Sequence, residues 1–435
     1  MNTTTNNILR INERVLIGRR TTAKYNDVVL PLNQGNPLIE ALPPLRTKKE
    51  VLALFSKEAP AYQLSERTRP ERERRELTST LFQVFIPLNR HLYIEEAITN
   101  GISGSYSYRN PLNHKYMLQQ IQNADAIDFE SNDYEEPMVG ASCLIGWAGT
   151  GKTRSLKRAL IRACPQVIDH TSYKETKLGI SQLTWLYVSC AHDGSVKDLC
   201  LNIAGAMDVI LGTQYKKLVE AGRTEHGMAR AIAGITALHT VGLIVIDEVQ
   251  NACIGRPIER QRLTRFITKL MNSMSTRIML VGTPEANDAL MRDMPLLRRT
   301  IGESGQIPWN RIETVKEWGR FMRGIWRYQY TATETKLTRE LAYKILTLTL
   351  GIPDLAVKLY CMAQKEVIGN KRYHDEKITE EVFEYVMRTR MAQAELVLKR
   401  MRADITTSSE WNHPRVQQIW LDMETKAETT QPDHG

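Results

Sequence analysis

The chain has 435 residues, which exceeds one typical domain and predicts two or three. Hydrophobic residues make up 42% and charged residues 25%, a composition that excludes general disorder and allows a sizeable core. The formal charge is +9, which is compatible with a polyanion partner such as DNA but does not require one.

No stretch of the sequence approaches the roughly 18 consecutive apolar residues of a membrane helix. The polar N-terminus also lacks the layout of a secretion signal, so we expect a cytoplasmic protein with no membrane partner. The six cysteines are scattered and form no CxxC pair. They predict neither a disulfide framework nor a metal site.

Residues 1–104 are predicted to be an N-terminal arm followed by a helical extension. Residues 1–45 mix polar stretches with prolines such as Pro37, Pro43 and Pro44 and are interpreted as an arm or a loosely packed leader. From residue 48 to about 100 the apolar residues recur at helical spacing. A run of alternating charges at 66–76 interrupts this pattern, and such a run is typical of a solvated helix face or loop rather than of a DNA contact.

Residues 105–310 are predicted to form an α/β domain. Short apolar runs alternate there with helical stretches, which is the pattern of buried parallel strands joined by crossover helices. We expect a five-stranded parallel sheet. Its candidate strands are residues 141–145, 183–189, 243–247, 277–281 and 306–309.

Residues 311–403 show only helical patterns and are predicted to form a small helical domain, with helices near 340–350, 355–367 and 380–401. The remaining residues, 404–435, form a polar tail that contains Trp411 and Trp420. The two tryptophans could dock onto a partner protein, or the tail could fold back on the helical domain.

A glycine-rich segment follows the first predicted strand and precedes a helix, and it matches the phosphate-binding pattern GxxxxGK[ST]. Glycines let backbone N–H groups approach phosphate closely, and the N-terminus of the following helix attracts negative charge. Lys152 can reach the β- and γ-phosphates, and Thr153 can ligate Mg²⁺. The predicted ATP-binding residues are Gly146, Trp147, Ala148, Gly149, Thr150, Gly151, Lys152, Thr153 and Arg154.

A second motif lies at the end of the apolar run 243–247, where two carboxylates follow one another. Asp247 is predicted to hold Mg²⁺, and Glu248 to polarise the attacking water. An apolar strand that ends in Asp-Glu is weak evidence alone, but together with the glycine loop in one α/β domain it predicts an ATPase with Mg²⁺ as cofactor.

The order of the motifs resembles the AAA+ class of P-loop ATPases. The strand at 277–281 ends in Gly282-Thr283-Pro284-Glu285-Ala286, where the resemblance implies that Thr283 is the sensor 1 residue. Arg298 and Arg299 precede the last strand and resemble the arginine finger that a neighbouring subunit inserts into the active site. The fold implied is an AAA+ core, a helical lid and a helical N-terminal extension, in a homo-oligomeric ring or filament.

More specifically, the sequence resembles the TnsC and TniB group of bacterial transposition regulators over roughly residues 105–365. The motifs that carry this resemblance are GWAGTGKT, LIVIDEVQN, VGTPEA, LLRR and GIPDLAVK. This resemblance implies an ATP-dependent oligomer on duplex DNA. Its implied partners are a target-selecting protein of the TniQ or TnsD type and the transposase subunits. DNA would be held through phosphate, and by the resemblance Lys197, Lys216 and Lys217 are the predicted contacts, although each lysine could equally well be a solvated surface residue.

One feature departs from many AAA+ proteins. Where the lid usually carries a sensor 2 arginine, this sequence has Asp354, and Lys358 could substitute for the arginine. Two other functions stay open from the sequence. The chain could be a helicase loader or replication initiator, or an ATP-gated signalling scaffold that acts without DNA.

Overall fold

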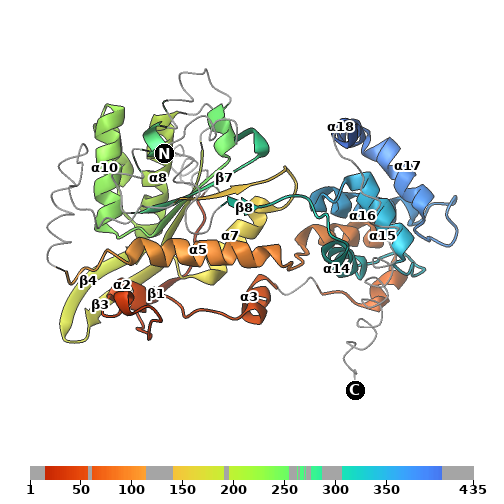
Figure 1. Ribbon diagram of the computed structural model, residues 1–435. Coiled ribbons are helices and arrows are strands. Elements are labelled where there is room, and N and C mark those ends of the chain that lie inside the picture. Colours follow the sequence, from red (N-terminus) through yellow and green to blue (C-terminus); the bar gives the residue numbers. More distant parts are fainter. Residues whose placement is uncertain are drawn as a thin grey trace, which may run out of the picture. The chain divides into compact units, whose positions relative to one another are not determined.

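The computed structural model describes residues 15–56, 61–113, 141–190, 195–253, 262, 265–268, 270, 276–286 and 306–403. Two compact units are present (Figure 1). The first consists of Met1–Leu54, Arg90–Gly146 and Lys152–Trp309, and the second of Phe55–Asn89, Trp147–Gly151 and Asn310–Gly435. The predicted N-terminal extension, residues 1–104, therefore divides between the two units.

A five-stranded parallel sheet forms the centre of the first unit, with the strand order β5-β6-β7-β2-β8. The α/β fold with a five-stranded parallel sheet that the sequence predicts is thus confirmed. The strands are β2 (Ser142–Ile145), β5 (Trp185–Ser189), β6 (Leu243–Asp247), β7 (Arg277–Gly282) and β8 (Gln306–Pro308). Because all five strands are parallel, their carboxyl ends lie along one edge of the sheet, which is where ligands bind in such folds.

Helices cover both faces of this sheet (Figure 1). On one face, α8 and α10 pack with alternate strand residues such as Ile244 and Ile246. On the other face, Gly101 of α5 approaches Leu243, and α5 packs against α7. The helices are α5 (Arg90–Tyr106), α7 (Lys152–Ala163), α8 (Val196–Leu211), α9 (Tyr215–Ala221) and α10 (Glu225–Leu238).

A second, three-stranded sheet was not predicted from the sequence. It consists of β1 (Arg20–Thr22), β3 (Val167–Tyr173) and β4 (Thr176–Leu183), with β1 parallel and β4 antiparallel to β3. Leu183 therefore ends β4, and the predicted strand at 183–189 begins only at Trp185.

Part of the predicted leader, residues 15–45, is anchored on the first unit. The leader contributes β1, a short η1 (Pro31–Asn33) and α2 (Pro37–Glu40). Leu38 of α2 is fully buried, and the Asn36 amide donates to the Tyr106 carbonyl at 2.8 Å. The segment is thus anchored in the first unit at α2, whereas β1 and residues such as Val29 and Leu32 are exposed. Next along the chain is α3 (Lys48–Phe55).

The second unit is helical, as predicted. Its elements before the sheet are η2 (Leu64–Thr68), α4 (Glu71–Leu77) and η3 (Thr78–Gln83). After the sheet come α14 (Val315–Trp326), α15 (Arg339–Thr349), α16 (Pro353–Val367), α17 (Glu380–Arg390) and α18 (Ala392–Ala403). The single helix expected at 380–401 is thus two helices, separated at the buried Met391.

Within the described ranges, no single helix is long and apolar enough to span a membrane. The bent pair of α15 and α16, which meet at 119°, passes the same criteria of length and composition only when both helices are taken together.

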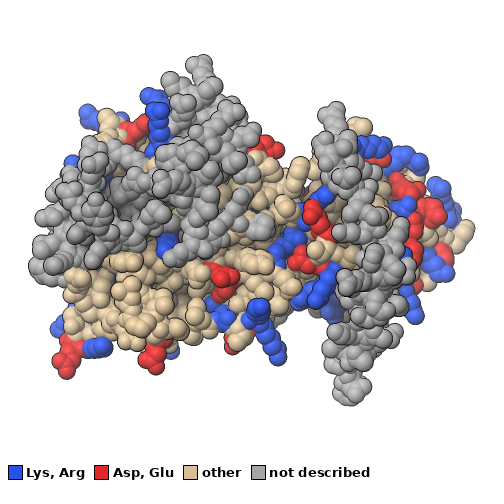
Figure 2. All heavy atoms as spheres, in the orientation of Figure 1, with Lys and Arg blue, Asp and Glu red and all other residues tan. Residues whose placement is uncertain are grey.

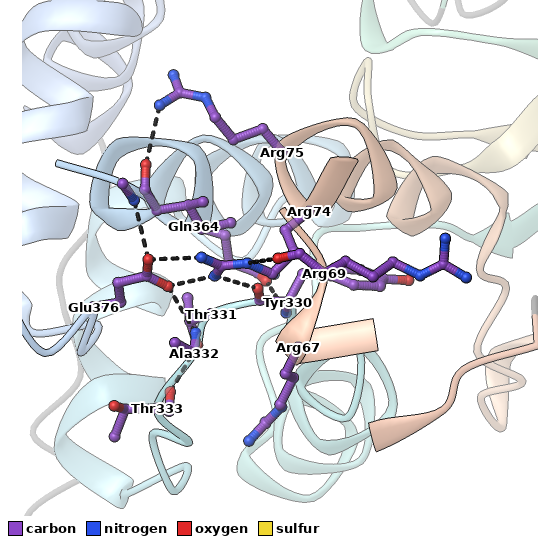
Figure 3. Close-up of polar contacts among 12 residues, drawn as sticks. Arg67, Arg69, Arg74, Arg75, Tyr330, Thr331, Ala332, Thr333, Gln364 and Glu376 are labelled. Carbon is purple, nitrogen blue, oxygen red and sulfur yellow. Dashed lines mark hydrogen bonds and ion pairs between the residues drawn. The ribbon is translucent and has the colours of Figure 1, made fainter. Parts of the chain in front are cut away.

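The alternating charge run at 66–76 is not simply a solvated face, because Arg74 is 5% exposed. Its guanidinium binds both carboxylate oxygens of Glu376, at 2.5 and 2.9 Å, and donates to the Tyr330 carbonyl at 3.0 Å (Figure 3). Glu376 also accepts backbone N–H groups of Ala332 and Gly369. This network fastens α4 to the helices that follow the sheet, so the buried arginine has a structural role.

Candidate nucleotide-binding site

The glycine loop begins directly after β2, and glycine is required at several of its positions. A Cβ at Gly146 would lie 1.8 Å from the Trp309 carbonyl oxygen, which no side chain could tolerate. Gly149 and Gly151 have φ angles of +76° and +87°, in the left-handed region that favours glycine. Between them, the Thr150 hydroxyl donates to the Trp147 carbonyl at 2.6 Å and stabilises the turn.

Lys152 is the first residue of α7 and is only 8% exposed. Its ammonium donates to the Gly146 carbonyl at 2.5 Å, across the loop. Burial lowers the pKa of Lys152, while the carboxylates of Asp247, Glu248 and Glu285 oppose that effect. The lysine is a buried cation among carboxylates, which is the environment expected of a phosphate-binding group. Arg154, two residues further along α7, is exposed.

Thr153 and Asp247 meet at the carboxyl end of β6. The Thr153 hydroxyl donates to Asp247 Oδ2 at 2.8 Å, and Asp247 is 1% exposed. Tyr187 of β5 also donates to this oxygen, at 2.7 Å. Burial, and next the charge of Asp247, raise the pKa of the Tyr187 hydroxyl far above its ordinary value, so it stays a donor.

Glu248 follows Asp247 directly, but its side chain is exposed. Its φ of +59° places it in the left-handed region, which is unusual for a residue with a side chain. The Glu248 N–H donates to Asp247 Oδ1 at 2.8 Å, so the two carboxyl groups have different environments. One is buried beside Thr153, and the other faces solvent.

Thr283 lies just beyond β7, beside the start of the glycine loop, because Gly146 N–H donates to the Gly282 carbonyl at 3.1 Å. The Thr283 hydroxyl is hydrogen-bonded to Glu285, and this bond is the main cause of the lowered pKa of the Glu285 carboxyl. The backbone N–H of Thr283 donates to Gln250 Oε1 at 3.1 Å. Thr283 is therefore held from both sides at the edge where β2 and β6 also end.

These residues fit a nucleoside triphosphate with Mg²⁺. The donor set contains a buried ammonium at Lys152 and a hydroxyl–carboxylate pair at Thr153 and Asp247, which are groups that phosphate and Mg²⁺ select. When bound, Mg²⁺ supplies positive charge that neutralises the phosphate oxygens. Lys152 would bind phosphate, Thr153 and Asp247 would hold the metal, and Glu248 would orient water and take up its proton.

The glycine loop and the helical domain contact each other within the second unit. Asp354, near the start of α16, donates its backbone N–H to the Gly149 carbonyl at 3.2 Å. Its side chain accepts from Lys358 at 2.6 Å, so the residue at the usual sensor 2 position forms an ion pair with Lys358. A Cβ at Gly149 would lie 3.0 Å from Ile352, which is a second reason for glycine there.

The other predicted site residues stay predictions. Arg298 and Arg299 lie outside the described residues, as does the tail with its two tryptophans. Lys197 is exposed near the start of α8, and Lys217 of α9 is exposed and donates to Gln214. Lys216 is half-buried, with its stem 3.9 Å from the Cβ position of Gly205 in α8.

Sequence reasoning missed two residues of the site, Tyr187 and Gln250. Tyr187 lies inside an apolar run, so its hydroxyl gave no signal; only the parallel register of β5 and β6 places it near Asp247. Gln250 lies only two residues after Glu248, and this short separation could have indicated that the two side chains contact each other.

Residues 139–290 match the protein-family model described as "AAA domain", which covers about a third of the chain. This segment is an AAA domain. The match is to a domain of AAA+ ATPases and agrees with the P-loop fold of the α/β unit. A search of curated proteins finds no match.

Three solved structures are similar to part of the chain. The ORC1 protein of Aeropyrum pernix in complex with DNA is 18% identical, with a TM-score of 0.38, over 64% of this chain and 66% of that one, which is just under two thirds. The Walker-type ATPase PABY2304 of Pyrococcus abyssi is 12% identical, with a TM-score of 0.36, over 66% of this chain and 77% of that one. PCH-2 of C. elegans is 15% identical, with a TM-score of 0.32, over 64% and 68%.

Proposed function

We propose that this chain hydrolyses ATP with Mg²⁺ and acts as a switch in DNA transposition. In its ATP-bound state it oligomerises on duplex DNA and links a target-selecting protein of the TniQ or TnsD type to the transposase, and hydrolysis reverses that state. The observation that carries the ATPase part is the meeting of Lys152, Thr153, Asp247 and Glu248 at the ends of β2 and β6. The transposition part is supported by the resemblance of the motifs to TnsC and TniB.

The contact between Gly149 and Asp354 supports the idea that the lid senses the nucleotide. Asp354 belongs to the Gly-Ile-Pro-Asp motif by which the chain resembles the transposition regulators. Its N–H donates to the Gly149 carbonyl, so a movement of the loop backbone would displace the start of α16. In this proposal no sensor 2 arginine is needed, and Arg298 or Arg299 of a neighbouring copy completes the site.

DNA binding is proposed to occur through phosphate contacts from Lys197, Lys216 and Lys217 on α8 and α9. On the face drawn in Figure 2, the described lysine and arginine side chains are interspersed with acidic ones and form no continuous basic patch. We expect oligomerisation to raise the affinity, because several weakly bound copies on one duplex reinforce one another.

The first test compares the purified wild-type chain with Glu248→Gln, using Glu96→Gln on the exposed side of α5 as the control. Glu248→Gln should bind ATP with unchanged affinity and lose hydrolysis, since the amide cannot accept a proton from water. Electron microscopy with ATP and duplex DNA should then show stable rings or filaments for this variant. A hydrolysis rate equal to that of wild type would refute the role of Glu248.

The second test concerns DNA. Replacing Lys197, Lys216 and Lys217 by alanine should weaken DNA binding and lower the slope of log K against log salt by about 2 to 3, since each lost phosphate contact contributes about 0.9. The matched control replaces the exposed Lys48, Lys49 and Lys177. If DNA changes neither assembly nor turnover of the wild-type chain, the signalling scaffold is the better function. Stimulation of a replicative helicase instead of a transposase would favour the loader.

A further inference from the structure

Gln250 links the proposed water-activating residue to the end of the neighbouring strand. It lies in the short helix η4 (Val249–Cys253), directly after β6. Its side-chain N–H donates to Glu248 Oε2, and its side-chain oxygen accepts the Thr283 backbone N–H at 3.1 Å. One amide group therefore contacts Glu248 on one side and the residue after β7 on the other.

Gly282 and Asn251 determine where the Gln250 side chain can lie. Gly282 is the last residue of β7, and a Cβ there would lie 3.0 Å from Gln250 Oε1, so a side chain would press on the amide. The next residue, Asn251, is buried and donates its N–H to the Glu248 carbonyl at 2.9 Å. The backbone from Glu248 to Asn251 thus forms a closed turn that carries Gln250 toward Thr283.

Only a side chain with both a donor and an acceptor can make the two bonds at once. A carboxylate could accept from Thr283 but could not donate to Glu248, and an apolar side chain could do neither. The bond to Glu248 uses one carboxylate oxygen, and the Glu248 side chain is exposed, so the group remains open to water. Its orientation is nevertheless tied to the position of Thr283.

From this geometry we infer that Gln250 is a positioning residue that sets the direction of the Glu248 carboxylate and couples it to the end of β7. The inference rests on the proposed ATPase function. A group that activates water must be placed within a fraction of an ångström, and a displacement of about 1 Å can reduce a rate about 100-fold. Gln250 supplies that placement and transmits any movement at Thr283 to Glu248.

The test uses two substitutions in the full chain that separate the two hydrogen bonds. Gln250→Met keeps the length of the side chain and loses both bonds, whereas Gln250→Glu keeps the acceptor for Thr283 and loses the donor to Glu248. The control is Gln34→Met, at an exposed glutamine. For each variant we would measure the kcat of ATP hydrolysis, the Kd of ATP, and amide hydrogen exchange across residues 281–286 without nucleotide.

Both Gln250 variants should lower kcat by about 10- to 100-fold at an unchanged Kd for ATP. Exchange at the Thr283 amide should accelerate in Gln250→Met and stay at the wild-type rate in Gln250→Glu, because only the second keeps the acceptor. A purely structural role would instead change Kd and kcat together, and faster turnover in either variant would mean that Gln250 restrains Glu248. Either result overturns the inference.

These outcomes are distinguishable from failure of the ATPase proposal itself. If Glu248→Gln leaves hydrolysis intact, the proposed role of Glu248 falls, whatever the Gln250 variants do. If Glu248→Gln abolishes hydrolysis while both Gln250 variants keep the wild-type kcat, the ATPase proposal stands and the positioning role is wrong.

Discussion

Replacing Arg74 by methionine would break the most deeply buried ion pair that the described residues contain. The Arg74 and Glu376 side chains are 6% and 10% exposed, and their closest nitrogen and oxygen atoms lie 2.5 Å apart. Methionine preserves much of the volume but leaves the Glu376 carboxylate buried without its cation. Removing one partner of such a pair costs about 3–5 kcal/mol, because the remaining charge is uncompensated. We expect the second unit to lose that much stability.

The same charge run offers a matched control. Arg69 pairs with Glu73 at 3.3 Å, but both side chains are 53% exposed, so Arg69→Met should cost no more than about 1 kcal/mol. Hydrogen exchange of α16 amides reports the opening of the second unit. It should accelerate roughly 100- to 4,000-fold in Arg74→Met, at 1.4 kcal/mol for each factor of ten, and at most about 5-fold in Arg69→Met. Equal effects of the two substitutions would refute the structural role of Arg74.

Three further predictions concern the nucleotide site and pH. Lys152→Met should abolish the thermal stabilisation of the chain by ATP, because the buried cation that binds phosphate is gone. Tyr187→Phe should raise the Mg²⁺ concentration needed for half-maximal turnover about 10-fold or more, since Asp247 loses a donor that orients it; an unchanged Mg²⁺ titration would contradict this. Burial raises the pKa of Glu376, but its hydrogen bonds from Arg74, Ala332 and Gly369 outweigh burial and lower it overall. Its stabilising contribution should therefore be complete above the unfolded pKa of about 4.3 and be lost as acid titration passes below it, which pH-dependent unfolding of wild type against Arg74→Met would measure.

The parts of the fold that the sequence predicted are those in which the signal is local. The glycine loop is a single run of eight residues, and β6 is an apolar run whose bounds, Leu243–Asp247, agree with the prediction. Their meeting also follows from a general rule, because parallel strands end at one edge of the sheet. The sequence alone therefore indicates that Thr153 and Asp247 lie close together.

The parts that were missed depend on partners far away in the sequence. β1 is only three residues long and entirely exposed, so no apolar pattern marks it; it becomes a strand by pairing with β3, nearly 150 residues later. Arg74 looked like part of a solvated run because its partner, Glu376, is 302 residues away. The apolar periodicity continues from α17 into α18, so the sequence pattern predicts one helix. The structure has two helices, with a break at Met391.

Glu248 shows where local preference and function oppose each other. Its φ of +59° is a conformation in which a Cβ is unfavourable by about 1–2 kcal/mol, whereas glycine adopts it freely. Glu248→Ala and Glu248→Gly both remove the carboxylate and should both stop hydrolysis. The glycine variant should nevertheless be more stable than the alanine variant by about 1 kcal/mol.

The same pair of substitutions at Glu96, an exposed residue inside α5, should give the opposite order, because glycine is about 1 kcal/mol worse than alanine within a helix. Urea unfolding of the four variants measures both differences. If alanine is the more stable residue at both positions, the backbone at Glu248 is not strained. If glycine is the more stable residue at position 248 and alanine at position 96, the chain retains an unfavourable backbone conformation at Glu248. This is the residue whose exposed carboxylate directly follows the buried carboxylate of Asp247. Strain of this kind persists where surrounding bonds enforce it, and here the Glu248 N–H bond to Asp247 and the Asn251 N–H bond to the Glu248 carbonyl do so.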